Sequence, residues 1–136
     1  MSATARTALD WQAENVLQLD PNKEVAEVER LGLEWVEKDE QASILEETKK
    51  TVLAQLIREE QLASKSTGGK GIPMNQAESN ALASPVFESH LKGMVAARAE
   101  ANRAKVRYDS ARIRIELLRS LIAARREEMR LGSIRT

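Results

Sequence analysis

The stretch that decides the fold is residues 85–132, PVFESHLKGMVAARAEANRAKVRYDSARIRIELLRSLIAARREEMRLG. After Pro85 it contains no further proline, and strong helix formers make up most of it. It therefore predicts one helix over 85–131, about 70 Å long. Ser84 before Pro85 is a typical helix start, because serine caps free N–H groups and proline at the first position loses no hydrogen bond. Gly132 predicts the C-terminal cap.

Apolar residues recur every seven positions in this stretch, in two rows offset by three residues. The first row is Phe87, Met94, Ala101, Tyr108, Ile115, Ile122 and Met129, and the second is His90, Ala97, Ala104, Ala111, Leu118 and Arg125. These are the a and d positions of a coiled-coil heptad repeat, called the seam below. The helix is therefore predicted to face a partner helix, and the alanines allow close approach.

A second helix is predicted upstream, over 21–63, because Asp20-Pro21 repeats the start signal and no later proline interrupts it. Its a and d rows are Val28, Trp35, Ala42, Lys49, Leu56 and Leu31, Lys38, Leu45, Val52. Lysine interrupts this seam twice; these side chains either reach out to solvent or meet phosphate. Residues 64–84 are predicted to be a linker with one or two helical turns. Residues 1–19 are predicted to be an arm or short helix before the hairpin domain over 20–136.

The net charge of zero hides a division between the two halves of the chain. Residues 1–63 contain 7 basic and 14 acidic side chains, and residues 64–136 contain 14 basic and 7 acidic ones. Beside the seam, at the e and g positions, lie Arg98, Lys105, Arg107, Arg112, Arg114, Arg119 and Arg126 in the second helix, and Glu27, Glu34, Asp39, Glu46 and Glu60 in the first. Opposite charges favour pairing of the two helices over self-pairing. The predicted fold is all-α, a long antiparallel helical hairpin.

Catalytic, metal and cofactor sites are not expected. The chain has no cysteine and one histidine, which excludes thiolate chemistry, histidine metal clusters and a Ser-His-Asp triad. No apolar run approaches the ~18 residues of a membrane span, and the first residues do not resemble a signal peptide. We therefore expect a non-enzymatic, soluble, cytoplasmic protein.

A two-helix hairpin buries only one stripe of each helix, so further apolar residues need cover. Among those off the seam are Leu53, Ile57, Ile113, Leu117 and Leu121. Exposed apolar stripes usually mark interfaces, so we expect a homo-oligomer with Leu53, Ile57, Leu117 and Leu121 at or near its interface.

The linker is the predicted nucleic-acid contact. Its Gly68-Gly69-Lys70-Gly71 lacks the spacing of a nucleotide-binding P-loop and reads as a tether or as a contact with polyanions. Lys65 and Lys70 flank glycines whose backbone N–H groups can approach phosphate, and Lys49 and Lys50 precede them on the first helix.

Several short motifs resemble phage recombination mediator proteins of the UvsY type. They are Trp35-Val36-Glu37-Lys38, Leu45-Glu46 and Lys49-Lys50, then the Ser/Gly-rich break, Glu78-Ser79 and Leu82-Ala83-Ser84 before a long helix. The resemblance covers roughly residues 25–131. It implies single-stranded DNA binding, ring-like oligomers, loading of a RecA-like recombinase and displacement of single-strand-binding protein, in DNA recombination and repair in the host cytoplasm.

This chain is neutral at Ala54, Gln55 and Leu56, where the family is basic. The DNA contact is therefore expected at Lys65, Lys70 or the second helix. The alternative function is a structural or adaptor coiled coil without DNA binding, such as a virion component, because the acidic helix can neutralise the arginines of the basic one.

Overall fold

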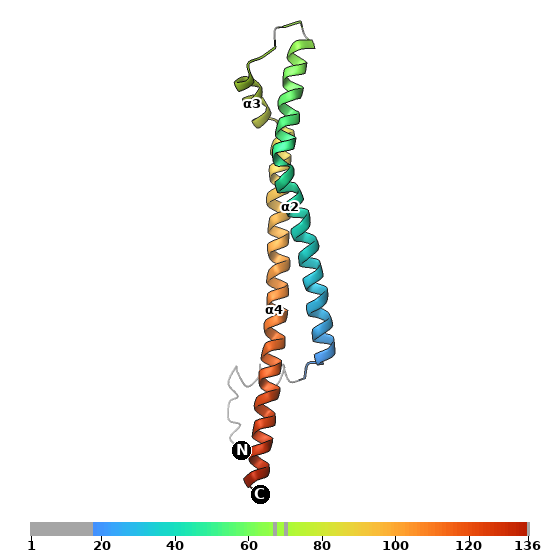
Figure 1. Ribbon diagram of the computed structural model, residues 1–136, viewed down its shortest axis with the longest axis vertical. Helices are drawn as coiled ribbons and strands as arrows, with labels where there is room; N and C mark the ends of the chain where they lie inside the picture. Colours follow the sequence, from blue (N-terminus) through green and yellow to red (C-terminus); the bar gives the residue numbers. More distant parts are fainter. Residues whose placement is uncertain (1–17, 67, 70, 136) are drawn as a thin grey trace, which may run out of the picture. The chain divides into compact units, whose positions relative to one another are not determined.

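The structure is a computed structural model that describes residues 18–66, 68–69 and 71–135. These residues form helices α2 (Pro21–Ser66), α3 (Met74–Leu82) and α4 (Pro85–Arg135), and none of them lies in a strand (Figure 1). The all-helical prediction is confirmed. The predicted arm over 1–19 lies, up to Leu17, outside the described residues.

Both predicted helix starts are confirmed by their capping hydrogen bonds. The N–H of Asn22 donates to Asp20 Oδ1 over 3.0 Å, and the N–H of Val86 donates to Ser84 Oγ over 3.2 Å. Each proline follows its cap as the first helical residue. The predicted C-terminal cap at Gly132 is wrong, because α4 continues to Arg135. A glycine inside a helix costs only about 1 kcal/mol, too little to end a long helix by itself.

The short helix α3 lies beside the last turns of α2 (Figure 1). Asn80 Nδ2 donates to Glu60 Oε2 over 3.4 Å, and Gln61 Nε2 lies 3.7 Å from Met74 Sδ. The buried face of α3 is made of small residues, since both Ala77 and Ala81 are fully buried.

Two compact units make up the chain, and each is described by itself. One comprises Met1–Glu34 and Ala104–Thr136, and the other comprises Trp35–Arg103. Within each unit α2 and α4 run antiparallel, because residues later in α2 contact residues earlier in α4. In one unit Glu34 pairs with Arg107 and Glu24 with Arg114. In the other, Leu45 contacts His90 and Asp39 pairs with Arg98.

The predicted seam is the buried part of both long helices. Every buried residue of α2 and α4 lies on the predicted a and d rows: Leu31, Ala42, Phe87, Ala101, Ala104, Ala111 and Leu118. The seam ends before the prediction does, since Arg125 is exposed and Met129 is 67% exposed. Glu24, close to the start of α2, pairs with Arg114, so α4 extends past the end of its partner helix.

Two seam positions depart from a simple apolar stripe. A Cβ at Gly32 would lie 3.1 Å from Cε2 of Tyr108, so glycine lets this ring approach α2 closely. His90 Nε2 lies 3.0 Å from the carbonyl oxygen of Leu45 and donates to it, because a carbonyl oxygen can only accept.

Candidate functional site

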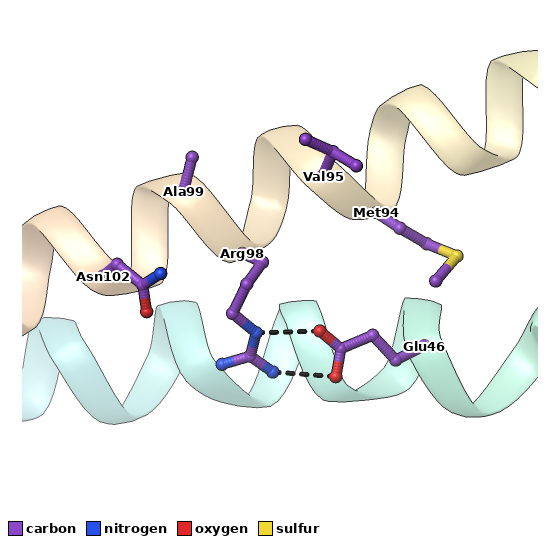
Figure 2. Close-up of a pocket in the computed structure, with 6 residues that line it drawn as sticks. All are labelled: Glu46, Met94, Val95, Arg98, Ala99 and Asn102. Carbon is purple, nitrogen blue, oxygen red and sulfur yellow. Dashed lines mark hydrogen bonds and ion pairs between the residues drawn. The ribbon is translucent and has the colours of Figure 1, made fainter.

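The basic side chains of α4 are the candidate site, and Arg98 shows how one of them is neutralised. Its guanidinium donates to Glu46 through Nε over 2.8 Å and through Nη2 over 2.9 Å (Figure 2). Its Nη1 donates to Asp39 over 2.6 Å. These hydrogen bonds raise the pKa of Arg98, and the bond from Arg98 lowers the pKa of Glu46. This arginine is committed to holding α4 against α2.

The other unit repeats this arrangement on the opposite flank of the seam. Arg107 Nη2 lies 3.2 Å from an oxygen of Glu34, and Arg114 Nη1 lies 3.6 Å from an oxygen of Glu24. Arg103 pairs with Glu100 on its own helix over 3.4 Å. The predicted pairing of basic with acidic flanks is therefore confirmed at Arg98 and Arg107, whereas Arg114 pairs with Glu24, which lies outside the predicted acidic flank.

Three arginines of the same predicted flank behave differently, and we call Arg112, Arg119 and Arg126 the arginine row. They are exposed and follow one another at seven-residue intervals, about 10 Å apart along α4. No carboxylate among the described residues pairs with any of them; Arg112 instead lies 5.8 Å from the centroid of the Tyr108 ring. Glu116 is the one acidic residue between Arg112 and Arg126.

The reason lies in what α2 offers at the matching positions. An antiparallel pair brings e positions together, and Arg98 meets the e residues Asp39 and Glu46. Continuing the heptad toward the start of α2 gives Gly32 and Val25, which are uncharged. The arginine row therefore has no acidic flank opposite it. The uncharged residues Val25 and Gly32 can be read from the sequence, but the predicted pairing of the flanks rests only on the acidic residues of the first helix.

The structure describes part of the predicted contact in the linker. Lys65 is exposed, and its side-chain Cε and Cγ lie 3.6 Å from where a Cβ of Gly71 would be. Gly68 and Gly71 adopt positive φ angles of 84° and 81°, a conformation that glycine favours. Lys70 lies outside the described residues. Of the two lysines predicted for this contact, the described residues include Lys65, which lies in the last turn of α2.

Lys49 and Lys50 are both exposed, but the structure does not bring them to the linker. The helix α2 continues through Ser66, so Lys50 and Lys65 are separated by 15 residues of helix, about 22 Å. Lys49 faces a different side of α2 from Lys65, since 16 residues correspond to a turn of about 160°.

None of the four predicted interface residues is fully buried. Leu53, Ile57 and Leu121 are half-buried, and Leu117 is 44% exposed. None of them is part of the buried seam.

An open groove of about 380 Å³ lies beside the ion pair of Arg98 and Glu46. Its lining combines Met94, Val95, Ala99 and Asn102 of α4 with the Arg98–Glu46 pair (Figure 2). Both charged groups are already bonded to each other, so the groove offers an apolar wall and no free acid or base. Among the described residues no group of three or more His, Asp or Glu side chains is placed to hold a metal ion. None of the described helices is long and apolar enough to cross a membrane.

Comparisons of this chain with protein-family models, with curated proteins and with solved structures found no match.

Proposed function

We propose that this protein is a non-enzymatic accessory protein that binds single-stranded DNA through the arginine row of α4. The observation that carries the proposal is that Arg112, Arg119 and Arg126 are exposed and lack carboxylate partners in the described part of the chain. By contrast, Arg98, Arg107 and Arg114 of the same helix pair with carboxylates of α2. A charge left unpaired on a rigid helix is available to a polyanion.

A row of arginines suits the backbone of a nucleic acid better than its bases. Guanidinium groups bind phosphate oxygens with charge-assisted hydrogen bonds, and such contacts are indifferent to base sequence. The stretch 112–126 contains five arginines and one glutamate, so its surplus of positive charge is local. Lys65 adds a separate contact in the last turn of α2, and Lys49 and Lys50 remain further candidates on the same helix.

The resemblance to UvsY-type mediators supports the choice of single strands and extends the proposal. On that basis the protein acts in DNA recombination, where it assists loading of a RecA-like recombinase and displaces single-strand-binding protein.

The test is the salt dependence of binding to a labelled single-stranded oligonucleotide. We expect Arg112→Gln, Arg119→Gln and Arg126→Gln, combined, to weaken binding of every oligonucleotide alike. The slope of log affinity against log salt should fall by about 2, since each phosphate contact to a single strand contributes about 0.7. The matched control removes three charges outside the arginine row, by Lys23→Gln, Arg58→Gln and Lys92→Gln, and should change the slope little.

A second variant separates the arginine row from the linker. Replacing Lys65 and Lys70 by alanine should leave helicity intact and reduce the slope by less than the arginine variant does. If the lysine variant loses binding and the arginine variant does not, the contact lies on the linker. If the parent protein does not bind at low salt, the protein is not a DNA-binding protein.

A structural or adaptor role is the second candidate, and the exposed apolar side chains favour it. Fifteen large apolar residues in the described part of the chain are at least 44% exposed. Such residues mark protein interfaces when they form contiguous stripes. We propose for both functions that the protein is a homo-oligomer, because each unit buries few side chains by itself.

A further inference from the structure

A second apolar stripe runs along α4 in the unit that contains its C-terminal part. It consists of Val106, Ser110, Ile113, Leu117, Ser120 and Ala124, and all six residues are exposed. Val106 is 64% exposed, Ile113 60% and Leu117 44%. Leu131, 45% exposed, lies seven residues after Ala124, but the stripe position between them is occupied by Glu127. Large apolar side chains are common on surfaces singly, but here they are aligned.

The stripe lies on the side of α4 that is turned away from α2. Each of its members follows a seam residue by two positions, as Val106 follows Ala104 and Ile113 follows Ala111. Two residues turn a helix by about 200°. The spacing alternates between four and three residues, which is the spacing of a second heptad seam.

The charged residues nearest the stripe differ in sign between its two sides. Arg107 and Arg114 lie on one side, one residue after Val106 and Ile113. Asp109 and Glu116 lie on the other side, with Lys105, Arg112 and Arg119 beside them and farther from the stripe. Asp109 has no ion-pair partner among the described residues. The ion pair of Arg114 with Glu24 is long, with 3.6 Å between the nitrogen and the oxygen.

This charge pattern distinguishes the two possible orientations of a self-paired helix. Antiparallel pairing would place arginine flank against arginine flank and acidic flank against acidic flank. Parallel pairing would place Asp109 of one copy beside Arg114 of the other, because g and e positions five residues apart meet in a parallel pair. Like-charge contacts are a strong way to reject one arrangement.

We propose that a second copy of this chain docks on the stripe, with the two α4 helices parallel and in register. The inference rests on the homo-oligomer proposed above and adds its surface and orientation. The arginine row lies on another side of α4, so docking leaves it exposed.

The absence of native cysteine makes a direct test possible. Ser110→Cys and Ser120→Cys place a thiol within the stripe, and both positions are exposed. In a parallel pair in register each residue faces its own copy, close enough for a disulfide. We expect each variant of the full chain to form a covalent dimer under mild oxidation. Ala26→Cys, exposed on α2, is the matched control for random collision and should remain uncross-linked.

Four results would overturn the inference. If each variant fails to cross-link alone but a mixture of the two does, the helices are antiparallel. If neither cross-links and the thiol of Ser110→Cys resists alkylation, another segment of the chain covers the stripe. If sedimentation shows an oligomer but no variant cross-links and the thiols react freely, the proposed oligomer stands and this interface does not. A monomer by sedimentation removes both proposals.

Discussion

Alanine occupies four of the seven buried positions of α2 and α4: Ala42, Ala101, Ala104 and Ala111. A methyl group adds little apolar area, so these residues bring the backbones together rather than supply much hydrophobic free energy. Most of the hydrophobic stabilisation at the seam therefore falls to the few larger buried side chains, Leu31, Phe87 and Leu118.

Truncation of Leu118 should therefore be costly. Leu118 is only 3% exposed, and we expect Leu118→Ala to lower the free energy of unfolding by about 2–3 kcal/mol, because it leaves a cavity in a thin core. Leu33 in the same unit is 66% exposed, and Leu33→Ala is the matched control with a change within about 0.5 kcal/mol. Urea denaturation followed by circular dichroism measures both. Equal losses in the two variants would contradict the seam.

Gly32 and Gly93, two of the three glycines inside the described helices, should respond differently to alanine. Alanine gains up to about 1 kcal/mol over glycine inside a helix, and nothing lies within 4 Å of the Cβ that Gly93→Ala adds. At Gly32 the new Cβ meets Tyr108 at 3.1 Å, so the ring has to move and the gain should be smaller. Thermal unfolding of both variants compares them directly; a gain at Gly32 equal to that at Gly93 would show that the ring is not confined.

At the level of the helices, charge pairing orients α4 against α2. Exposed ion pairs contribute little to stability individually, so their effect is mainly on direction and register. Arg98 is the best-connected of them, since it bonds two carboxylates of α2 and also lies 3.4 Å from Ser43 Oγ.

The Arg98–Glu46 pair predicts a pH dependence. The hydrogen bond from Arg98 lowers the pKa of Glu46 in the folded state, so folding favours the ionised carboxylate. Its contribution is fully present above the usual glutamate pKa of about 4.3 and is lost as the pH falls through the lowered value. The difference in unfolding free energy between parent and Glu46→Gln should be level from pH 8 to 6 and shrink in more acidic solution.

The matched control is Glu47→Gln, the next residue, which is exposed and has no ion-pair partner among the described residues. It should leave stability unchanged at neutral pH. A Glu46→Gln difference that grows toward acidic pH would contradict the assignment.

For the molecule as a whole, the small number of buried side chains suggests that further contacts are needed for stability. One unit buries Leu31, Ala104, Ala111 and Leu118, and the other buries Ala42, Ala77, Ala81, Phe87 and Ala101. Small domains with little buried surface usually need additional contacts for stability. Self-association supplies such contacts and is common to both proposed functions.

We therefore expect a charge in the interface to lower the mass of the assembly. Leu117→Glu should do so, because burying an unpaired carboxylate costs several kcal/mol, and Ile57→Glu tests the predicted interface on α2 in the same way. Leu33→Glu, at an exposed position outside the predicted interface, should leave the mass unchanged. Light scattering at micromolar concentration measures all three. A parent protein that is monomeric there would show that the chain does not self-associate.

Local signals were enough to predict the helices and their buried face. Asp20-Pro21 and Ser84-Pro85 define the starts because capping depends on neighbouring residues alone, and a seven-residue period marks one side of a helix wherever its partner lies. The end of α4 could not be predicted in this way, because Gly132 weakens a helix without stopping it.

The neutralisation of each arginine is decided only by tertiary structure. Arg98 meets Asp39 and Glu46, whereas the matching positions for the arginine row are Val25 and Gly32, and that depends on the register of two helices far apart in sequence. Tertiary structure likewise separates Lys50 from Lys65, because α2 continues without a break between them. Which charges are paired depends on how two helix surfaces meet, so the sequence of either helix alone does not determine it.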